Sequence, residues 1–188
     1  MSLKPFLFCK RRSLVGLPWR GFVFGSFLLS SLLFSGRCFA ESESLTAVNF
    51  QWYLDNHQQI VETIQGGQSA EVIPIVNTLG SIWQHKDGAV WVEVAPAIAQ
   101  ALMHQNELML TWFIAHPKAW QEWQSNMTNA LFTNWDGSDQ QTQQLEALRQ
   151  TMLDKLAKLT KSPTSEQQSA MNQTLHALIS ASSVRVID

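Results

Sequence analysis

The 188-residue sequence contains two cysteines, Cys9 and Cys38, and both lie within its first 40 residues. Residues 41–188 therefore cannot form a disulfide, hold a metal ion through thiolates or use a cysteine nucleophile. A chain of this length can bury enough apolar surface to fold as one domain without such support. We therefore expect side-chain packing alone to hold residues 41–188 together.

Residues 41–188 also lack the motifs of common catalytic sites. A Gly-x-Ser-x-Gly elbow, a phosphate-binding loop, a Ser-x-x-Lys pair and a His-Glu-x-x-His motif are all missing from this part of the sequence. Asp136 and Asp139 flank Gly137, but an EF-hand needs oxygen ligands spread over about twelve positions. We expect a turn here, with a helix cap at Ser138 or Asp139. The sequence thus predicts no catalytic residues, no metal site and no cofactor.

No acidic residue precedes Glu41, whereas residues 1–40 carry six lysines and arginines. An apolar run follows over residues 22–34, and small residues stand at Cys38 and Ala40. Basic, apolar and small-residue regions in this order are typical of a signal peptide. We therefore predict a cleavable signal peptide over residues 1–40, cut between Ala40 and Glu41. The remaining chain, residues 41–188, would be a single periplasmic or secreted domain.

Two alternatives concern this segment. The first is a retained membrane anchor, although the apolar run of 13 residues is shorter than the roughly 20 that a transmembrane helix needs. The second concerns the export route. Arg11-Arg12 is a loose twin-arginine match and Arg37 is unusual beside a general-secretion site, but the apolar run rich in Phe and Leu suits general secretion. We favour general secretion and predict no membrane span after cleavage.

Cleavage would change the charge of the protein. Residues 41–188 retain 7 lysines and arginines against all 15 acidic residues, so the formal net charge would fall from −2 to −8. An acidic domain without a basic cluster is repelled by nucleic acid and by anionic membranes. The sequence therefore predicts a protein partner rather than nucleic acid.

Apolar residues recur at helical spacing along most of residues 41–188. Gly66-Gly67, Pro117 and Pro163 interrupt the pattern where helices are expected to end or begin. We predict five to seven helices with short connections. This indicates an all-α fold, either a small helical bundle or stacked antiparallel helix pairs. The apolar spacing over 96–113 predicts one helix that begins at Pro96.

Residues 82–94 leave two interpretations open. Asp87-Gly88 between two β-prone runs is typical of a short hairpin. Alternatively, a helix ends near His85, a turn follows at Asp87-Gly88, and a new helix begins. We favour the helical interpretation because the sequence on both sides is helical. At the C-terminus, the short tail 184–188 can be extended.

Tryptophan is the most distinctive component, since seven of the eight tryptophans lie after residue 40. The candidate binding residues are four of them: Trp112, Trp120, Trp123 and Trp135. As core residues they would supply large burial, because one aromatic side chain buries roughly 150–250 Å². As surface residues they would form a binding patch, since Trp is enriched at interface hot spots, or a platform on which sugars stack. We favour the core interpretation.

Three polar residues are the remaining candidates. His104 and Glu107 lie three apart on the helix predicted over 96–113, and His116 precedes Pro117. A helical metal site needs several such pairs, and no second Glu-x-x-His or His-x-x-Glu pair follows Ala40. We therefore interpret His104 and Glu107 as a solvated surface pair and His116 as a helix-boundary residue.

These observations predict an exported helical protein that acts by binding another protein, such as an inhibitor, an immunity-type factor or an accessory subunit. The basis is the acidity of residues 41–188, their tryptophan content and the missing catalytic motifs. The alternative is a periplasmic hydrolase or a small-ligand-binding protein. It would use a pocket near the Trp-rich region, with His104, Glu107 and His116 as its polar groups.

Overall fold

The computed structural model describes residues 35–85, 88–160 and 165–187. These ranges form seven helices and two short strands, so the all-α prediction is confirmed. The helices and strands are α1 (Ser35–Gly66), α2 (Ser69–His85), α3 (Ala89–His104), α4 (Asn106–Ala115), α5 (Pro117–Leu131), β1 (Thr133–Asn134), α6 (Asp139–Leu159), α7 (Glu166–Ser180) and β2 (Arg185–Val186).

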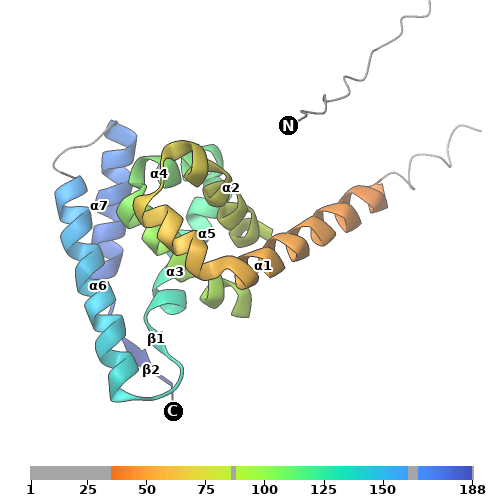
Figure 1. Cartoon of the computed structure of the whole chain (residues 1–188). Helices are drawn as coiled ribbons and strands as arrows, with labels where there is room; N and C mark the ends of the chain where they lie inside the picture. The colour runs from red at the N-terminus through yellow and green to blue at the C-terminus, as the bar shows by residue number, and fades with distance from the viewer. Residues whose placement is uncertain (1–34, 86–87, 161–164, 188) are drawn as a thin grey trace, which may run out of the picture.

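The helices form two groups. Helices α2 to α5 pack around the main core, and α1 lies along α2 and α3 with its C-terminal half, while its N-terminal half projects away from the other helices (Figure 1). Helices α6 and α7 run antiparallel and side by side along one flank (Figure 1). The interior is built mostly from α2, α3, α4 and α5, because most of the fully buried side chains come from these four helices.

The predicted signal peptide lies mostly outside the described residues, including its apolar run at 22–34 and Arg11-Arg12. The expected cleavage site between Ala40 and Glu41 lies within α1, which is continuous from residue 35 to residue 66. Within the ranges that the structure describes, no helix combines the length and the apolarity that a membrane span requires. Cleavage and export stay predictions.

The helical interpretation of residues 82–94 is the one observed. Helix α2 ends at His85 and α3 begins at Ala89, so the hairpin alternative is wrong for residues 82–85 and 88–94. Gly88 has a φ of 51°, which glycine adopts without strain. The indole Nε1 of Trp91 donates a hydrogen bond to the Trp83 carbonyl at 3.0 Å. This bond joins the two helices across the turn.

The single helix predicted over 96–113 is wrong. Helix α3 begins before Pro96, ends at His104 and is separated from α4 by Gln105, whose φ and ψ are −129° and 44°. The Gln105 side chain donates to the carbonyl of Ile64 at 3.0 Å. The Asn106 side chain donates to the carbonyl of Leu102 at 3.0 Å. These contacts satisfy carbonyls near two helix ends. The apolar spacing in the sequence is the same on both sides of the one-residue break, so it gave no sign that the helix ends at His104.

Strands β1 and β2 join the two ends of the α6–α7 pair. They pair in parallel, and backbone N–H groups of Arg185 and Ile187 donate to Phe132 and Asn134 at 2.8 and 3.1 Å. The extended tail expected from the sequence is thus confirmed over Arg185–Val186. The chain segments before α6 and after α7 are held beside each other by this pairing.

Candidate functional site

The main core contains a chain of stacked aromatic rings. Trp83 stacks on Trp91 with ring centroids 4.9 Å apart and meets Trp123 edge-on at 4.8 Å. Phe113 contacts Trp123 at 5.9 Å. Trp83, Trp123 and Phe113 are fully buried, and such pairs add stability beyond the area they bury. The aromatic cluster therefore forms the centre of the fold.

The four tryptophans taken as binding candidates have different environments. Trp123 is fully buried and Trp112 is 8% exposed, so both are core residues and neither presents a surface to a partner. Trp120 is half-buried and packs edge-on against Phe113 at 5.3 Å. Trp135 is 55% exposed. The core interpretation thus describes Trp112 and Trp123, and a binding role stays a hypothesis for Trp120 and Trp135.

Trp135 lines a cavity of about 420 Å³, which we call the Trp91–Trp135 groove. The groove lies where the N-terminus of α3, the C-terminal half of α5, the loop after β1 and strand β2 meet. Its apolar lining includes Trp91, Val92, Ala130 and Trp135, and its polar lining comprises Asn126, Asn129 and Arg185. Sequence reasoning missed Trp91 because residues 82–94 were ambiguous between a hairpin and two helices.

The buried Asn134 side chain shapes the loop that carries Trp135. Its Oδ1 accepts hydrogen bonds from the backbone N–H groups of Asp136 and Gly137 at 3.1 and 2.8 Å. Its Nδ2 donates to the Ser138 carbonyl at 2.8 Å. Ser138 caps α6, as expected, by accepting from the Gln141 N–H. The hydrogen bonds of the Asn134 side chain therefore hold the backbone of the loop that carries Trp135 in one conformation.

Among the described residues that line the groove, Arg185 is the only charged one. One guanidinium nitrogen lies 3.4 Å from the Thr133 hydroxyl. Among the described residues no carboxylate forms an ion pair with Arg185. The Asp136 carboxylate, next to Trp135 in sequence, accepts the backbone N–H of Ser138, which lowers the pKa of that carboxyl. The groove thus combines apolar surface with one cation that has no acidic partner in this part of the chain.

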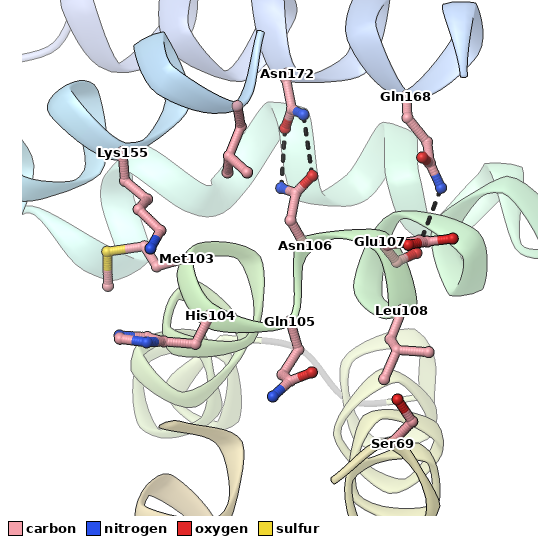
Figure 2. Close-up of a pocket in the computed structure, with 11 residues that line it drawn as sticks. Ser69, Met103, His104, Gln105, Asn106, Glu107, Leu108, Lys155, Gln168 and Asn172 are labelled. Atoms are coloured by element: carbon pink, nitrogen blue, oxygen red, sulfur yellow. Dashed lines mark hydrogen bonds between the residues drawn. The ribbon is translucent and has the colours of Figure 1, made fainter. Parts of the chain in front are cut away.

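A second cavity, of about 470 Å³, lies where the α3–α4 corner meets the α6–α7 pair. Figure 2 shows His104, Gln105, Asn106 and Glu107 from the corner, facing Lys155 from α6 and two amide side chains from α7. We call it the polar pocket. It contains His104 and Glu107 but no tryptophan.

The amides of the polar pocket bond to one another. Asn106 and Asn172 exchange two reciprocal hydrogen bonds of 3.0 Å (Figure 2). The Gln168 side chain donates to the Glu107 carbonyl at 3.4 Å and to the Thr111 hydroxyl at 3.3 Å. Asn172 and Gln168 are both buried. These bonds attach α7 to α4, so the pocket is first of all the polar contact between the two helix groups.

His104 and Glu107 both line the polar pocket and are both exposed, as expected of a surface pair, but the prediction that they share one helix turn is wrong. They belong to different helices, on either side of Gln105, rather than to one helix turn. Partial burial lowers the pKa of His104, and the positive charge of Lys155 lowers it further. Within residues 35–85, 88–160 and 165–187, no three His, Cys, Asp or Glu side chains are placed to hold a metal ion.

His116 lies away from both cavities. It caps the end of α4 as a boundary residue, and its ring stacks on Trp112 with centroids 4.1 Å apart. Its Nδ1 lies 2.8 Å from the Trp112 carbonyl. The structure therefore does not bring His104, Glu107 and His116 together, and the groove lined by tryptophan contains none of them.

Comparison with known proteins gives no match. No protein-family model fits the chain, and neither a curated protein nor a solved structure is significantly similar to it.

Proposed function

We propose that the chain is an exported helical protein that binds another protein through the Trp91–Trp135 groove. The observation that carries the proposal is the groove itself, where Trp91 and the exposed Trp135 line an apolar cavity together with Asn126, Asn129 and Arg185. Interface hot spots have this composition, with Trp and Arg anchors among polar neighbours. Val186 and Ile187, beside the groove in sequence, are also exposed.

The groove suits a macromolecular partner better than the polar pocket does. In the polar pocket, Asn106 and Asn172 already bond to each other and Gln168 bonds to the Glu107 carbonyl, so a ligand there would have to replace internal hydrogen bonds. The hydrogen bond that Trp91 donates to the Trp83 carbonyl does not have to break when a partner covers the apolar side chains of the groove. Covering them removes apolar surface from water, which is the main driving force of association.

Export is the second part of the proposal, and it rests on the order of basic, apolar and small residues in 1–40. Sequencing the N-terminus of the protein purified from its own cells tests it. We expect the first residue to be Glu41, in the periplasmic or secreted fraction. An N-terminus at Met1 in the cytoplasmic fraction would contradict it.

Site-specific photo-cross-linking tests the binding site. A photoreactive phenylalanine analogue replaces Trp135 in the full chain, and in a matched control it replaces the exposed Asn77 on α2. We expect one covalent adduct from position 135 that is missing from position 77. Excess wild-type protein should suppress this adduct, whereas excess Trp135→Ala protein should not. Identical adducts at both positions, or none at 135, would contradict the proposal.

A further inference from the structure

We infer that the partner of the groove is an extended protein segment with a bulky apolar side chain and a carboxylate two residues away on the same face. This inference rests on the proposed function, because it specifies what occupies the groove. Three features support it: the apolar lining of the groove, the charge of Arg185 and the open edge of β2.

The apolar lining selects a large apolar side chain. Trp91 contributes an indole ring that is fixed from behind, because it stacks on the buried Trp83 and donates to the Trp83 carbonyl. Trp135 lies on the loop that Asn134 holds in place. The cavity between such rigid walls exists before binding, so little ordering is needed when a side chain enters it.

Arg185 selects a carboxylate. It is the one charged group among the described residues of the lining, and no carboxylate in the described part of the chain pairs with it. A guanidinium binds a carboxylate through two parallel hydrogen bonds, which no neutral group reproduces.

The open edge of β2 selects an extended backbone. Arg185 and Ile187 direct their N–H groups to β1, so the backbone groups of Val186 point to the opposite side, as in any parallel pair. The sheet has only β1 and β2 among the described residues, so this side of β2 has no neighbouring strand. Exposed edges of this kind accept an added strand from a partner.

The same geometry sets the spacing of the two side chains. The apolar side chain and the carboxylate must both face the groove, because Arg185 lines it together with the tryptophans. Side chains of an extended segment alternate between two faces, so residues two apart lie about 7 Å from each other on one face. The closest spacing that meets this condition is two residues, so the inferred segment reads apolar-x-acidic or acidic-x-apolar, depending on its direction along β2.

Synthetic heptapeptides test this spacing. The probes are acetylated, amidated threonine-rich peptides that contain Phe-Thr-Glu or Glu-Thr-Phe, and the matched controls contain Phe-Glu-Thr or Glu-Phe-Thr at the same positions. Binding to the full chain is followed by the NMR shifts of the Trp135 indole N–H and the Val186 amide. We expect one spaced peptide to bind at least tenfold more tightly than both adjacent isomers. Equal affinities would overturn the inference.

Two substitutions separate the contributions. Arg185→Gln should reduce the affinity for the spaced peptide at least tenfold but leave the affinity for its Glu→Gln version unchanged. Val186→Pro removes the outward N–H and should weaken binding at least fivefold, whereas Val186→Ala retains that N–H and should change it less than twofold. If Val186→Pro lowers the melting temperature, hydrogen exchange of the Val186 amide in the wild-type protein is measured instead, and we expect it to become slower when the peptide is added. No effect of Arg185→Gln would overturn the assigned carboxylate.

Failure of this inference differs from failure of the proposed function. If position 135 cross-links to one partner but the captured segment is helical or has no acidic residue two positions away, the groove binds a protein and the extended acidic segment is wrong. If the protein itself occupies the groove, the cross-linked product is a dimer of the chain, which also overturns it. If position 135 captures nothing, the proposed function fails.

Discussion

Helices α2 to α5 and the α6–α7 pair are stabilised by different kinds of side chain. The first group buries large aromatic rings, with Trp83, Trp123 and Phe113 inaccessible to solvent and in contact. The second group buries a narrow aliphatic stripe that includes Leu156 and Leu175. Its aliphatic side chains belong to the same core as the aromatic rings, and amide hydrogen bonds add a polar contact between α7 and α4. Burial of aromatic rings contributes several kcal/mol per residue, whereas a typical hydrogen bond contributes about 1 kcal/mol net.

The Trp91–Trp135 groove depends both on helices α2 to α5 and on the α6–α7 pair. Trp91 and Ala130 come from the aromatic group, whereas Trp135 and Arg185 come from the segments that directly precede α6 and follow α7. The segments that flank the α6–α7 pair therefore position one wall of the groove. Changes in the aromatic group should affect the whole fold, and changes at the polar contact should affect the pair and the groove.

The largest effect is expected at Trp123. Replacing a fully buried tryptophan by alanine leaves a cavity and typically costs about 3–5 kcal/mol of unfolding free energy. Trp123→Ala should therefore unfold at much lower urea concentration, as measured by circular dichroism. The matched control is Trp135→Ala, which removes an exposed ring and should change the free energy of unfolding by less than about 0.5 kcal/mol. Similar losses for both variants would show that the aromatic group is not the main core.

The next effect is expected at Gly80, where α2 packs closely on Trp112 of α4. A Cβ at this position would overlap the indole of Trp112, and overpacking of this kind costs about 1–3 kcal/mol. Gly80→Ala should therefore lower the unfolding midpoint. Gly66→Ala is the control because nothing lies near its added Cβ, and it should be neutral. A neutral Gly80→Ala would contradict the close packing of α2 on α4.

A smaller and more local effect is expected at Asn172. Asn172→Ala leaves the Asn106 amide without its reciprocal partner, at a cost of about 1–3 kcal/mol if the gap stays dry. Hydrogen exchange should accelerate in α6 and α7 while α2 to α5 stay protected. Binding at the Trp91–Trp135 groove should weaken as well. Equal acceleration in both helix groups would mean that they unfold as one unit.

The smallest effect is expected from pH. The pKa of His104 lies below its ordinary value of 6.5 in the folded protein because of partial burial and Lys155. The unfolded state therefore binds the proton more readily, and stability should decrease as pH falls below about 6.5. His104→Gln should flatten this dependence in urea unfolding, and Lys155→Gln should reduce it. Solvent screening keeps the effect small. If the pH dependence of the unfolding free energy were the same in His104→Gln as in the wild type, the assignment of this effect to His104 would be wrong.

The sequence predicted the helical architecture correctly because glycine, proline and capping residues act locally. Gly66, Pro117, Ser138 and Ser165 stand where helices end or begin. The break at Gln105 could not be predicted in this way, since the bond from its side chain to Ile64 joins residues 41 positions apart. Apolar periodicity reports which face is buried but not which tertiary contacts interrupt a helix.

The candidate site was predicted only in part. Trp135 was named from the tryptophan content, but the same criterion selected Trp112 and Trp123, which are buried. Composition cannot separate a core tryptophan from a surface one. Trp91 and Arg185 reach the groove only through the turn at Gly88 and the pairing of β2 with β1. Such long-range placement has no signature in local sequence.

The affinity of the protein for the partner cross-linked at position 135 tests the central claim most directly. Isothermal titration calorimetry would compare wild-type protein with Trp135→Ala, after thermal unfolding has shown that the variant is as stable as wild type. The account predicts a loss of at least tenfold in affinity with Trp135→Ala, because a hot-spot tryptophan contributes more than about 1.4 kcal/mol to binding. An unchanged affinity would contradict the assignment of the Trp91–Trp135 groove as the binding site.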